Sequence, residues 1–208
     1  MGKNFEELIE GYQVFREKYA AGDKSIMKQL SDSGQSPQIM VVACSDSRVD
    51  PALILQCDPG DLFVVRNVAN IIPPFENDNA YHGTSAALEF GIRFLKVKHL
   101  IILGHSQCGG IQALLNQKKE SSTDFIENWV SIVKNNQSKN DNLDSAVKNS
   151  IQKSYDNCLS FPWLKERIEE ENLKVHLWFF EIKSGKIYSF LKGKDEFEPL
   201  KSRDDITF

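Results

Sequence analysis

Two short apolar segments constrain the fold of this chain more than any other feature. Residues 39–43 read Ile-Met-Val-Val-Ala, and residues 99–103 read His-Leu-Ile-Ile-Leu. Short, almost wholly apolar runs of this kind are typical of central parallel strands that are buried on both faces. The carboxyl ends of adjacent parallel strands meet at one edge of the sheet, where ligands bind. We therefore expect the residues that follow the two segments to lie close together.

Helical and strand patterns alternate along the rest of the chain. Ser184 and Gly185 predict a turn between the last two strands. Apolar residues lie on nearly all sides of the helix expected at 85–95, which predicts its burial. The tail from Glu196 to Phe208 is polar apart from a terminal apolar pair. The patterns predict an α/β fold, a parallel-centred β-sheet with an antiparallel edge strand, flanked by helices and preceded by an N-terminal helical arm. The expected strands are 39–43, 62–65, 99–103, 175–182 and 187–191, and the expected helices are 4–20, 25–30, 51–56, 85–95, 111–116, 123 or 124 to 133, 145–159 and 162–171.

Cysteine and histidine side chains follow both apolar segments. Cys44 follows the first, and His105 and Cys108 follow the second at a spacing that fits a tight turn. Two thiolates and one imidazole form a ligand set of catalytic zinc, which keeps a fourth position open. Gly109 and Gly110 would let backbone approach a metal closely. Spacing alone leaves two interpretations open, because a single Cys at a strand end is usually a buried small residue and one His-x-x-Cys arises by chance.

Asp46 and Arg48 lie two residues apart, immediately beyond Cys44. In an extended segment they point the same way, so the guanidinium can hold the carboxylate in a bidentate pair and keep it ionised. Such a carboxylate would orient a water molecule on a neighbouring metal. Two alternatives stay open. Asp46 could ligate the metal itself and close the site, or the two residues could form a surface ion pair that contributes under ~1 kcal/mol.

Charge and cysteine content limit the partners and the location. The formal charge of −4 and the pI of about 5.6 argue against nucleic acid or an anionic membrane as the partner. No apolar run approaches the roughly 18 residues of a membrane-spanning helix, and the acidic, polar start does not resemble a signal or transit peptide. The four cysteines are expected to be ligands or buried thiols rather than disulfides. We therefore expect a cytoplasmic protein.

Three motifs together resemble the β-class carbonic anhydrases, and within them the plant-type branch in a bacterial-sized chain. They are Cys44-Ser-Asp-Ser-Arg48, the segment Pro59–Asn70, and Gly104-His-Ser-Gln-Cys-Gly-Gly110. The similarity continues through Ser122–Trp129 and the C-terminal hairpin, so it covers nearly the whole chain. The resemblance implies reversible hydration of carbon dioxide to bicarbonate and a proton, by attack of hydroxide on one Zn²⁺ per subunit.

The resemblance also implies roles for individual residues. The implied zinc ligands are Cys44, His105 and Cys108, and the implied catalytic pair is Asp46 and Arg48, with Asp46 a ligand only in a closed state. The implied substrate pocket consists of Gln35, Phe63, Val68, Phe90 and the backbone N–H of Gly109, with Gln35 reaching in from the neighbouring subunit. Phe90 stands where the plant-type pocket usually has Tyr, so one hydroxyl is missing. Val41 replaces the Trp of the bicarbonate-inhibited branch, although Arg66 matches that branch's arginine.

We expect one domain, with residues 1–34 as a dimerising helical arm and residues 35–208 as the zinc-binding core. The implied partners are carbon dioxide or bicarbonate and further copies of the chain, as a homodimer or a dimer-based tetramer or octamer. Two other functions are open, a related zinc hydrolase of a small electrophile such as carbon disulfide and a non-catalytic zinc or thiol module. The proton route is also open, with His82 either a relay or a solvated loop residue.

Overall fold

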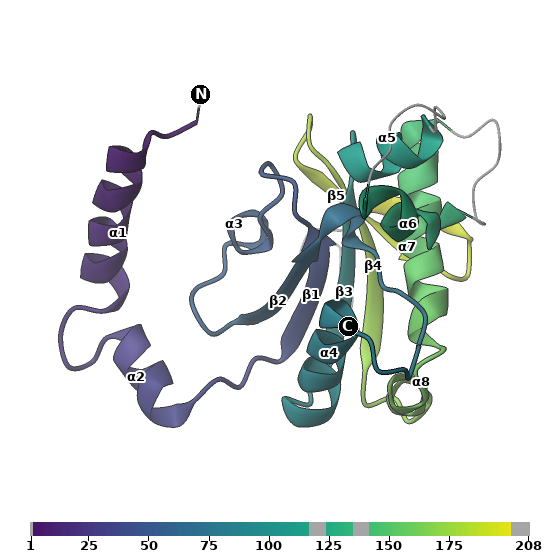
Figure 1. Ribbon diagram of the computed structural model, residues 1–208. Helices are drawn as coiled ribbons and strands as arrows, with labels where there is room; N and C mark the ends of the chain where they lie inside the picture. Colours follow the sequence, from purple (N-terminus) through teal and green to yellow (C-terminus); the bar gives the residue numbers. More distant parts are fainter. Residues whose placement is uncertain (1, 117–123, 135–141, 201–208) are drawn as a thin grey trace.

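A computed structural model describes residues 2–116, 124–134 and 142–200 of the chain. Six strands of this part form one sheet in the order β2-β1-β3-β4-β5-β6, and the first four are mutually parallel (Figure 1). Strands β5 and β6 continue the sheet in antiparallel pairing. The strands are β1 Ile39–Cys44, β2 Leu62–Asn67, β3 His99–His105, β4 Lys174–Glu181, β5 Lys186–Leu191 and β6 Glu196–Pro199. The predicted parallel-centred α/β sheet is confirmed.

The helices connect the parallel strands and extend from the N-terminal end. They are α1 Phe5–Tyr19, α2 Ile26–Ser33, α3 Pro51–Leu55, α4 Gly83–Glu89, α5 Gly109–Leu115, α6 Ile126–Ser131, α7 Leu143–Cys158 and α8 Pro162–Glu169. A 3₁₀ turn, η1 Val68–Asn70, follows β2, and a π-helical turn, η2 Phe90–Phe94, continues α4. None of the helices in the described part of the chain has the length and apolar content needed to cross a membrane.

Two glycines let helices approach one face of the sheet closely. Met40 in β1 and Gly104 in β3 lie on the same face, because Met40 pairs with Leu100 and side chains alternate along a strand. A Cβ atom at Gly91 in η2 would lie 2.6 Å from the Met40 Sδ. A Cβ atom at Gly104 would lie 2.6 Å from the Cδ1 of Ile151 in α7. The backbone of η2 therefore packs on the Met40 side chain, and the Ile151 side chain of α7 packs directly on the β3 backbone.

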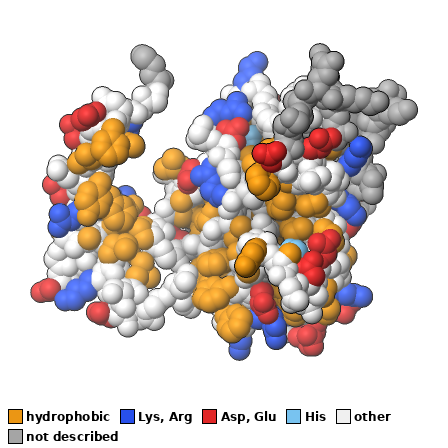
Figure 2. Space-filling model, viewed as in Figure 1, with side chains coloured by type: hydrophobic (Ala, Val, Ile, Leu, Met, Phe, Trp, Pro, Cys, Tyr) orange, Lys and Arg blue, Asp and Glu red, His pale blue; other side chains and the backbone are white. Residues whose placement is uncertain are grey.

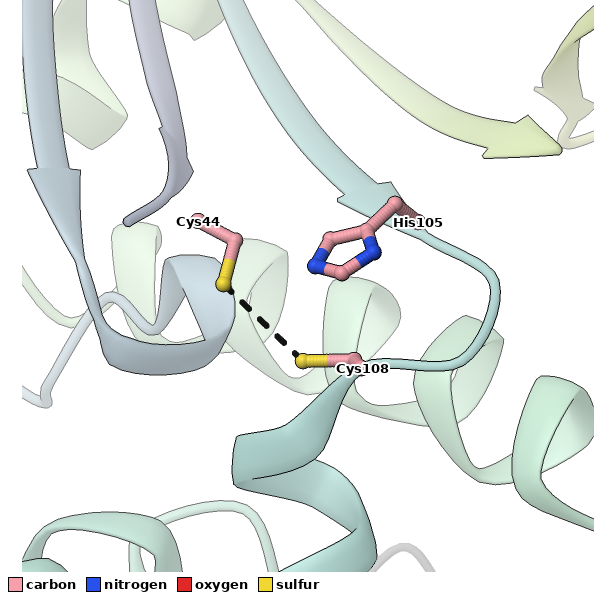
Figure 3. A group of neighbouring side chains, drawn as sticks. All are labelled: Cys44, His105 and Cys108. Carbon is pink, nitrogen blue, oxygen red and sulfur yellow. Dashed lines mark hydrogen bonds between the residues drawn. The ribbon is translucent and has the colours of Figure 1, made fainter. Parts of the chain in front are cut away.

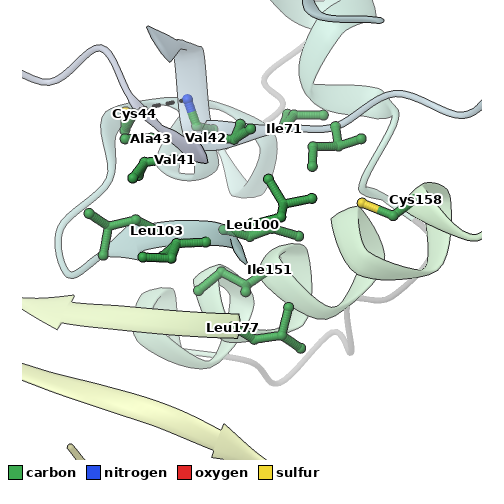
Figure 4. Close-up of a cluster of buried hydrophobic side chains, with 14 of the residues drawn as sticks. Val41, Val42, Ala43, Cys44, Ile71, Leu100, Leu103, Ile151, Cys158 and Leu177 are labelled. Carbon is green, nitrogen blue, oxygen red and sulfur yellow. Dashed lines mark hydrogen bonds between the residues drawn. The ribbon is translucent and has the colours of Figure 1, made fainter. Parts of the chain in front are cut away.

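Strand β1 lies at the centre of the core. Met40 to Ala43 are fully buried, and Cys44 is 5% exposed. Figure 4 shows residues of β1 among buried side chains of β3, α7 and β4, including Leu100, Ile151 and Leu177. The apolar run predicted the strand, and this burial fixes the position at which Cys44 ends it.

Helices α1 and α2 form an arm that extends away from the sheet (Figure 1). Asn4 and Glu7 start α1 with a capping box, in which each side chain accepts the other's backbone N–H. No residue of α1 is buried. Figure 2 shows hydrophobic side chains on the surface of this arm. The large exposed hydrophobic residues of α1 are Phe5, Leu8, Ile9, Tyr12, Val14 and Phe15. The amphipathic helix is present, but its apolar face has no partner within the described chain.

Two expectations about the fold are wrong. The helix expected at 85–95 is not buried on all sides, because its second half turns as a π-helix that keeps Ile92 inside and leaves Phe90 and Phe94 43% and 68% exposed. No strand was predicted in the polar tail, yet Glu196–Pro199 forms β6 by pairing with β5, which a pattern of apolar alternation could not reveal. Residue 123, an expected helix cap, and residues 201–208 lie outside the described residues.

Candidate metal centre

The structure brings Cys44, His105 and Cys108 together at the carboxyl edge of the sheet. Cys44 is the last residue of β1, His105 is the last residue of the adjacent strand β3, and Cys108 immediately precedes α5. All three side chains are buried, and their ligand atoms lie within 4.8 Å of one another. Figure 3 shows both sulfur atoms and one ring nitrogen pointing into the same space. Parallel pairing of β1 and β3 thus places residues distant in sequence side by side.

His105 presents one ring nitrogen to this space with no partner. Its Nδ1 lies 2.9 Å from the Ser106 carbonyl oxygen, which is the geometry of an N–H donating to that oxygen. The Nε2 atom is then the lone-pair nitrogen, and it is buried without a hydrogen-bond partner among the described residues. Buried polar atoms are rarely left unpaired, so this nitrogen calls for a ligand. A backbone carbonyl on the other ring nitrogen is the usual orienting contact of a metal-bound histidine.

The two thiol groups lie within hydrogen-bonding distance of each other. The Sγ atoms of Cys44 and Cys108 lie 4.0 Å apart. The pKa of Cys44 is lowered, first by a hydrogen bond from the Cys108 thiol and further by the N–H groups of Asp46 and Ala69, although burial opposes the shift. The pKa of Cys108 is raised by the same hydrogen bond and by burial. A thiolate next to a buried thiol is a place where a bound cation would replace the thiol proton.

This donor set fits zinc. A tetrahedral zinc with two Zn–S bonds of about 2.3 Å would place its sulfur atoms about 3.8 Å apart, close to the 4.0 Å between Cys44 and Cys108. The unpaired Nε2 of His105 supplies the third ligand atom. Three protein ligands are the number found in catalytic zinc sites, which leave one position for water or substrate.

Asp46 and Arg48 form the predicted bidentate pair beside the centre. The Arg48 Nε donates to Asp46 Oδ1 at 2.9 Å, and its second guanidinium nitrogen donates to Oδ2 at 2.7 Å. These hydrogen bonds hold the pKa of Asp46 well below its usual range, so the carboxylate stays ionised. Asp46 Oδ2 lies 4.0 Å from the His105 Nε2. The carboxylate is therefore close to the position of a metal without replacing a ligand.

Arg66 holds the loop that carries this pair, which sequence reasoning did not foresee. Its guanidinium donates to the carbonyl oxygens of Cys44 at 3.1 Å and Asp46 at 2.7 Å. A third contact, of 3.0 Å, joins it to the carboxylate of Asp50, which caps α3. From the sequence we noted only that Arg66 matches the arginine of the bicarbonate-inhibited branch. In this structure Arg66 fixes the loop between the end of β1 and the start of α3 by hydrogen bonds to its backbone and to Asp50.

A second loop closes on the sulfur of Cys44 from the other side. The backbone N–H of Ala69 points at the Cys44 Sγ, with 3.4 Å between nitrogen and sulfur. Ala69 has φ of 65°, in the left-handed region. Gly110 permits this arrangement, since a Cβ atom there would lie 2.7 Å from a methyl carbon of Val68. Gly110, two residues after Cys108, thus serves the close packing of the two loops.

The residues expected in the substrate pocket fall into two groups. Val68 and Gly109 lie next to the centre, since one follows the strand end that pairs with Cys44 and the other follows Cys108. Phe63 instead pairs with Met40, four residues before Cys44 along β1, which is roughly 13 Å at about 3.3 Å per residue. The Phe90 ring lies 5.8 Å from the Phe63 ring, and Gln35 lies in the exposed loop before β1. Within one chain, Gln35, Phe63 and Phe90 are not at the centre.

His82 lies at a cavity rather than at the centre itself. Its Nε2 is 2.7 Å from Asp78 Oδ1. Together with Asn67, Val68 and Trp129 it lines a cavity of about 620 Å³. Trp129 donates from its Nε1 to the Val68 carbonyl oxygen at 2.7 Å, so one wall of the cavity supports the turn that contacts Cys44.

The fold and the centre define an α/β protein with a buried Cys-His-Cys zinc site at the carboxyl edge of a parallel sheet. Comparison with known proteins identifies the family of this chain. Residues 39–187 match the family model described as "Carbonic anhydrase". The chain is 36% identical over 183 residues to beta carbonic anhydrase 5, chloroplastic, of Arabidopsis thaliana, and 35% identical over 196 residues to a carbonic anhydrase of Synechocystis. These alignments cover 83% and 89% of the chain.

Solved structures agree with these sequence matches. The β-carbonic anhydrase CcaA superposes with a TM-score of 0.84 and 34% identity, over 97% of this chain and 94% of that one. A tetrameric β-carbonic anhydrase of Sordaria macrospora gives a TM-score of 0.75 and 28% identity, over 89% of this chain and 95% of that one. The chain belongs to the β-carbonic anhydrase family. It spans 60% of the length of the Arabidopsis relative and 70% of the Synechocystis relative.

The Asp46–Arg48 pair predicts a change in pH dependence. In Arg48→Gln the guanidinium hydrogen bonds, which are the largest cause of the lowered pKa of Asp46, are lost. Burial, which raises this pKa, remains, as does the hydrogen bond from the backbone N–H of residue 48. Asp46 should then take up a proton as the pH falls, at values where the wild-type carboxylate stays ionised. We expect kcat/KM for carbon dioxide hydration to fall by about tenfold near pH 8 and further near pH 5. A variant-to-wild-type ratio that is constant across this range would contradict the role of Arg48.

Proposed function

We propose that this chain catalyses the reversible hydration of carbon dioxide to bicarbonate and a proton, with zinc held by Cys44, His105 and Cys108. One observation carries the proposal. A buried Cys-His-Cys group with an unpaired imidazole nitrogen lies beside an ionised carboxylate that is held by a guanidinium. The relatives named carbonic anhydrase support the reaction class.

The charge of the ligand set suits this chemistry. Two thiolates balance the two positive charges of Zn²⁺, so the ligands and the ion are neutral together. Zinc bound here would supply a water molecule that ionises near neutral pH and so serves as a nucleophile. Burial of Cys44, His105 and Cys108 excludes other water from the ligands.

Asp46 orients the reacting group in this proposal. Arg48 holds the carboxylate ionised, and an ionised carboxylate can only accept hydrogen bonds. Asp46 Oδ2, which lies 4.0 Å from His105 Nε2, would accept a hydrogen bond from a hydroxyl group at the centre. That contact aims the hydroxyl's lone pair away from Asp46 and towards the substrate. Val68 would form an apolar wall for carbon dioxide, and the Gly109 N–H would donate to one of its oxygens.

The remaining pocket residues would come from a neighbouring subunit. Gln35, Phe63 and Phe90 lie at the opposite end of the strands from Cys44, too far to line the same chain's centre. The rings of Phe90 and Phe94 stack at 5.8 Å, and their exposed faces form an apolar surface next to Phe63. The proposal therefore assigns the side-chain amide of Gln35 and the rings of Phe63 and Phe90 to the partner's centre.

The N-terminal arm supports a homodimer or a dimer-based tetramer or octamer. The unburied apolar face of α1 would be covered by a second copy of the chain, with residues 1–34 as the arm and 35–208 as the core. The Sordaria relative is described as tetrameric. A cytoplasmic location is part of the proposal, supported by four cysteines that form no disulfide.

Metal analysis with stopped-flow hydration assays tests the function. We expect about one zinc per subunit in the wild-type protein and hydration activity that rises with pH. Cys44→Ser should lower both the zinc content and the hydration rate, the latter by about a hundredfold or more, because a metal ligand is lost. Stoichiometric zinc without hydration activity between about pH 6 and pH 9 would refute the catalytic proposal, and hydrolysis of carbon disulfide alone would assign the centre to a different reaction.

Subunit mixing tests whether the pocket is shared. Gln35→Ala should retain zinc but lose turnover by about tenfold, the effect of one lost hydrogen bond in the transition state. Gln35→Ala and Cys44→Ser chains with different affinity tags are co-expressed, and the heterodimers are purified. In a heterodimer one centre combines Cys44 of the Gln35→Ala chain with Gln35 of the Cys44→Ser chain, and the other centre lacks both residues. Purified heterodimers should regain about half of the wild-type rate. No gain over Gln35→Ala alone would show that Gln35 acts within its own subunit or not at all.

A further inference from the structure

Gln107 lies between two of the proposed zinc ligands, His105 and Cys108, in a strained conformation. Its side chain is exposed, and its φ of 56° is in the left-handed region. Residues other than glycine adopt this region rarely, with asparagine and aspartate the usual exceptions. Backbone strain of this kind concentrates at functional sites and persists where the surroundings hold it. The contacts of Gln107 show what holds it.

The guanidinium of Arg48 bridges Asp46 and Gln107. One terminal nitrogen donates to the Gln107 side-chain Oε1 at 3.2 Å, and the other donates to the Gln107 backbone oxygen at 3.2 Å. Nε and the second terminal nitrogen also donate to Asp46, as described above. Arg48 therefore ties the loop after β1 to the loop after β3, which carry different ligands of the same centre.

Asp46 depends on this bridge for its position. Within the described chain, every hydrogen bond to its carboxylate comes from Arg48. Arg48 lies only two residues away on the same loop and its side chain is 44% exposed, so the two could move as a unit. Asp46 Oδ2 is already 4.0 Å from His105 Nε2, where a divalent cation would attract it. Arg66 holds the backbone of this loop, and the contacts with Gln107 join the Arg48 side chain to the loop between His105 and Cys108.

We propose that Gln107 is a positioning residue whose Oε1 anchors Arg48 and so keeps the Asp46 carboxylate paired with Arg48 instead of on the metal. Gln107 thereby holds the fourth metal position open. This inference rests on the proposed function, because it concerns the same centre. It assigns a role to a side chain whose Oε1 accepts from Arg48 rather than lying among the donor atoms of the metal ligands.

Two matched variants separate the effect of the Gln107 Oε1 acceptor from the effects of side-chain length and backbone conformation at this position. Gln107→Met keeps nearly the same length and the same backbone strain but removes the side-chain acceptor, while the backbone oxygen that also accepts from Arg48 stays. Gln107→Glu keeps an acceptor at the same reach. Each is compared with wild type as the cobalt(II)-substituted protein, whose visible absorption reports the metal's ligands, and as the zinc protein in carbon dioxide hydration. The hydration rate of the wild type is measured first, so that failure of the proposed function appears there and not in the variants.

We expect Gln107→Met to show an altered cobalt spectrum and a kcat about tenfold lower, the effect of one lost hydrogen bond to a charged group. Adding Asp46→Asn should restore the spectrum of an open site, and Gln107→Glu should match the wild type in both measurements. Gln107→Gly removes the acceptor and relieves the strain, so it should give the same spectral change even if Gln107→Met folds poorly. A wild-type spectrum in the Met and Gly variants, or equal changes in Met and Glu, would overturn the proposal.

Discussion

The pairing of β1 with β3 is the contact on which the rest of the site depends. It sets Cys44 and His105 on adjacent parallel strands whose last residues meet at one edge. Both strands can be apolar almost throughout because helices and neighbouring strands bury them, and that burial removes water from the ligand atoms. A slip of one residue in the register would turn either side chain to the other face. Packing of the core therefore determines the geometry of the centre.

Two guanidinium groups then hold the loops that leave these strands. Arg66 binds the backbone on either side of Ser45 and the cap of α3, and Arg48 joins Asp46 to Gln107. Both are partly exposed, yet each makes several hydrogen bonds to fixed groups, which single surface ion pairs do not. The planar guanidinium suits this role because it presents its donors in a rigid arrangement. Hydrogen bonds from these two side chains, rather than hydrophobic packing, therefore position the loops around the metal.

The sequence was sufficient for features that depend on local pattern. The central strands, the convergence of Cys44, His105 and Cys108, and the pairing of Asp46 with Arg48 could be predicted because apolar runs and spacing encode them. The exposure of Phe90 could not be predicted, since a π-helical turn rotates the second half of its helix. The clamp formed by Arg66 and the bridge through Gln107 depend on loops folded against each other, and no periodicity records such contacts. The short strand β6 forms by pairing with β5 rather than by its own apolar pattern.

X-ray absorption at the zinc edge tests the central claim most directly, because it counts the ligands that the strand ends supply. We expect two sulfur atoms at about 2.3 Å from the zinc, one imidazole nitrogen at about 2.0–2.1 Å, and one further light atom. Cys108→Ser should leave one sulfur. A zinc with four sulfur ligands, or with no sulfur, in the wild-type protein would contradict the assignment of Cys44, His105 and Cys108.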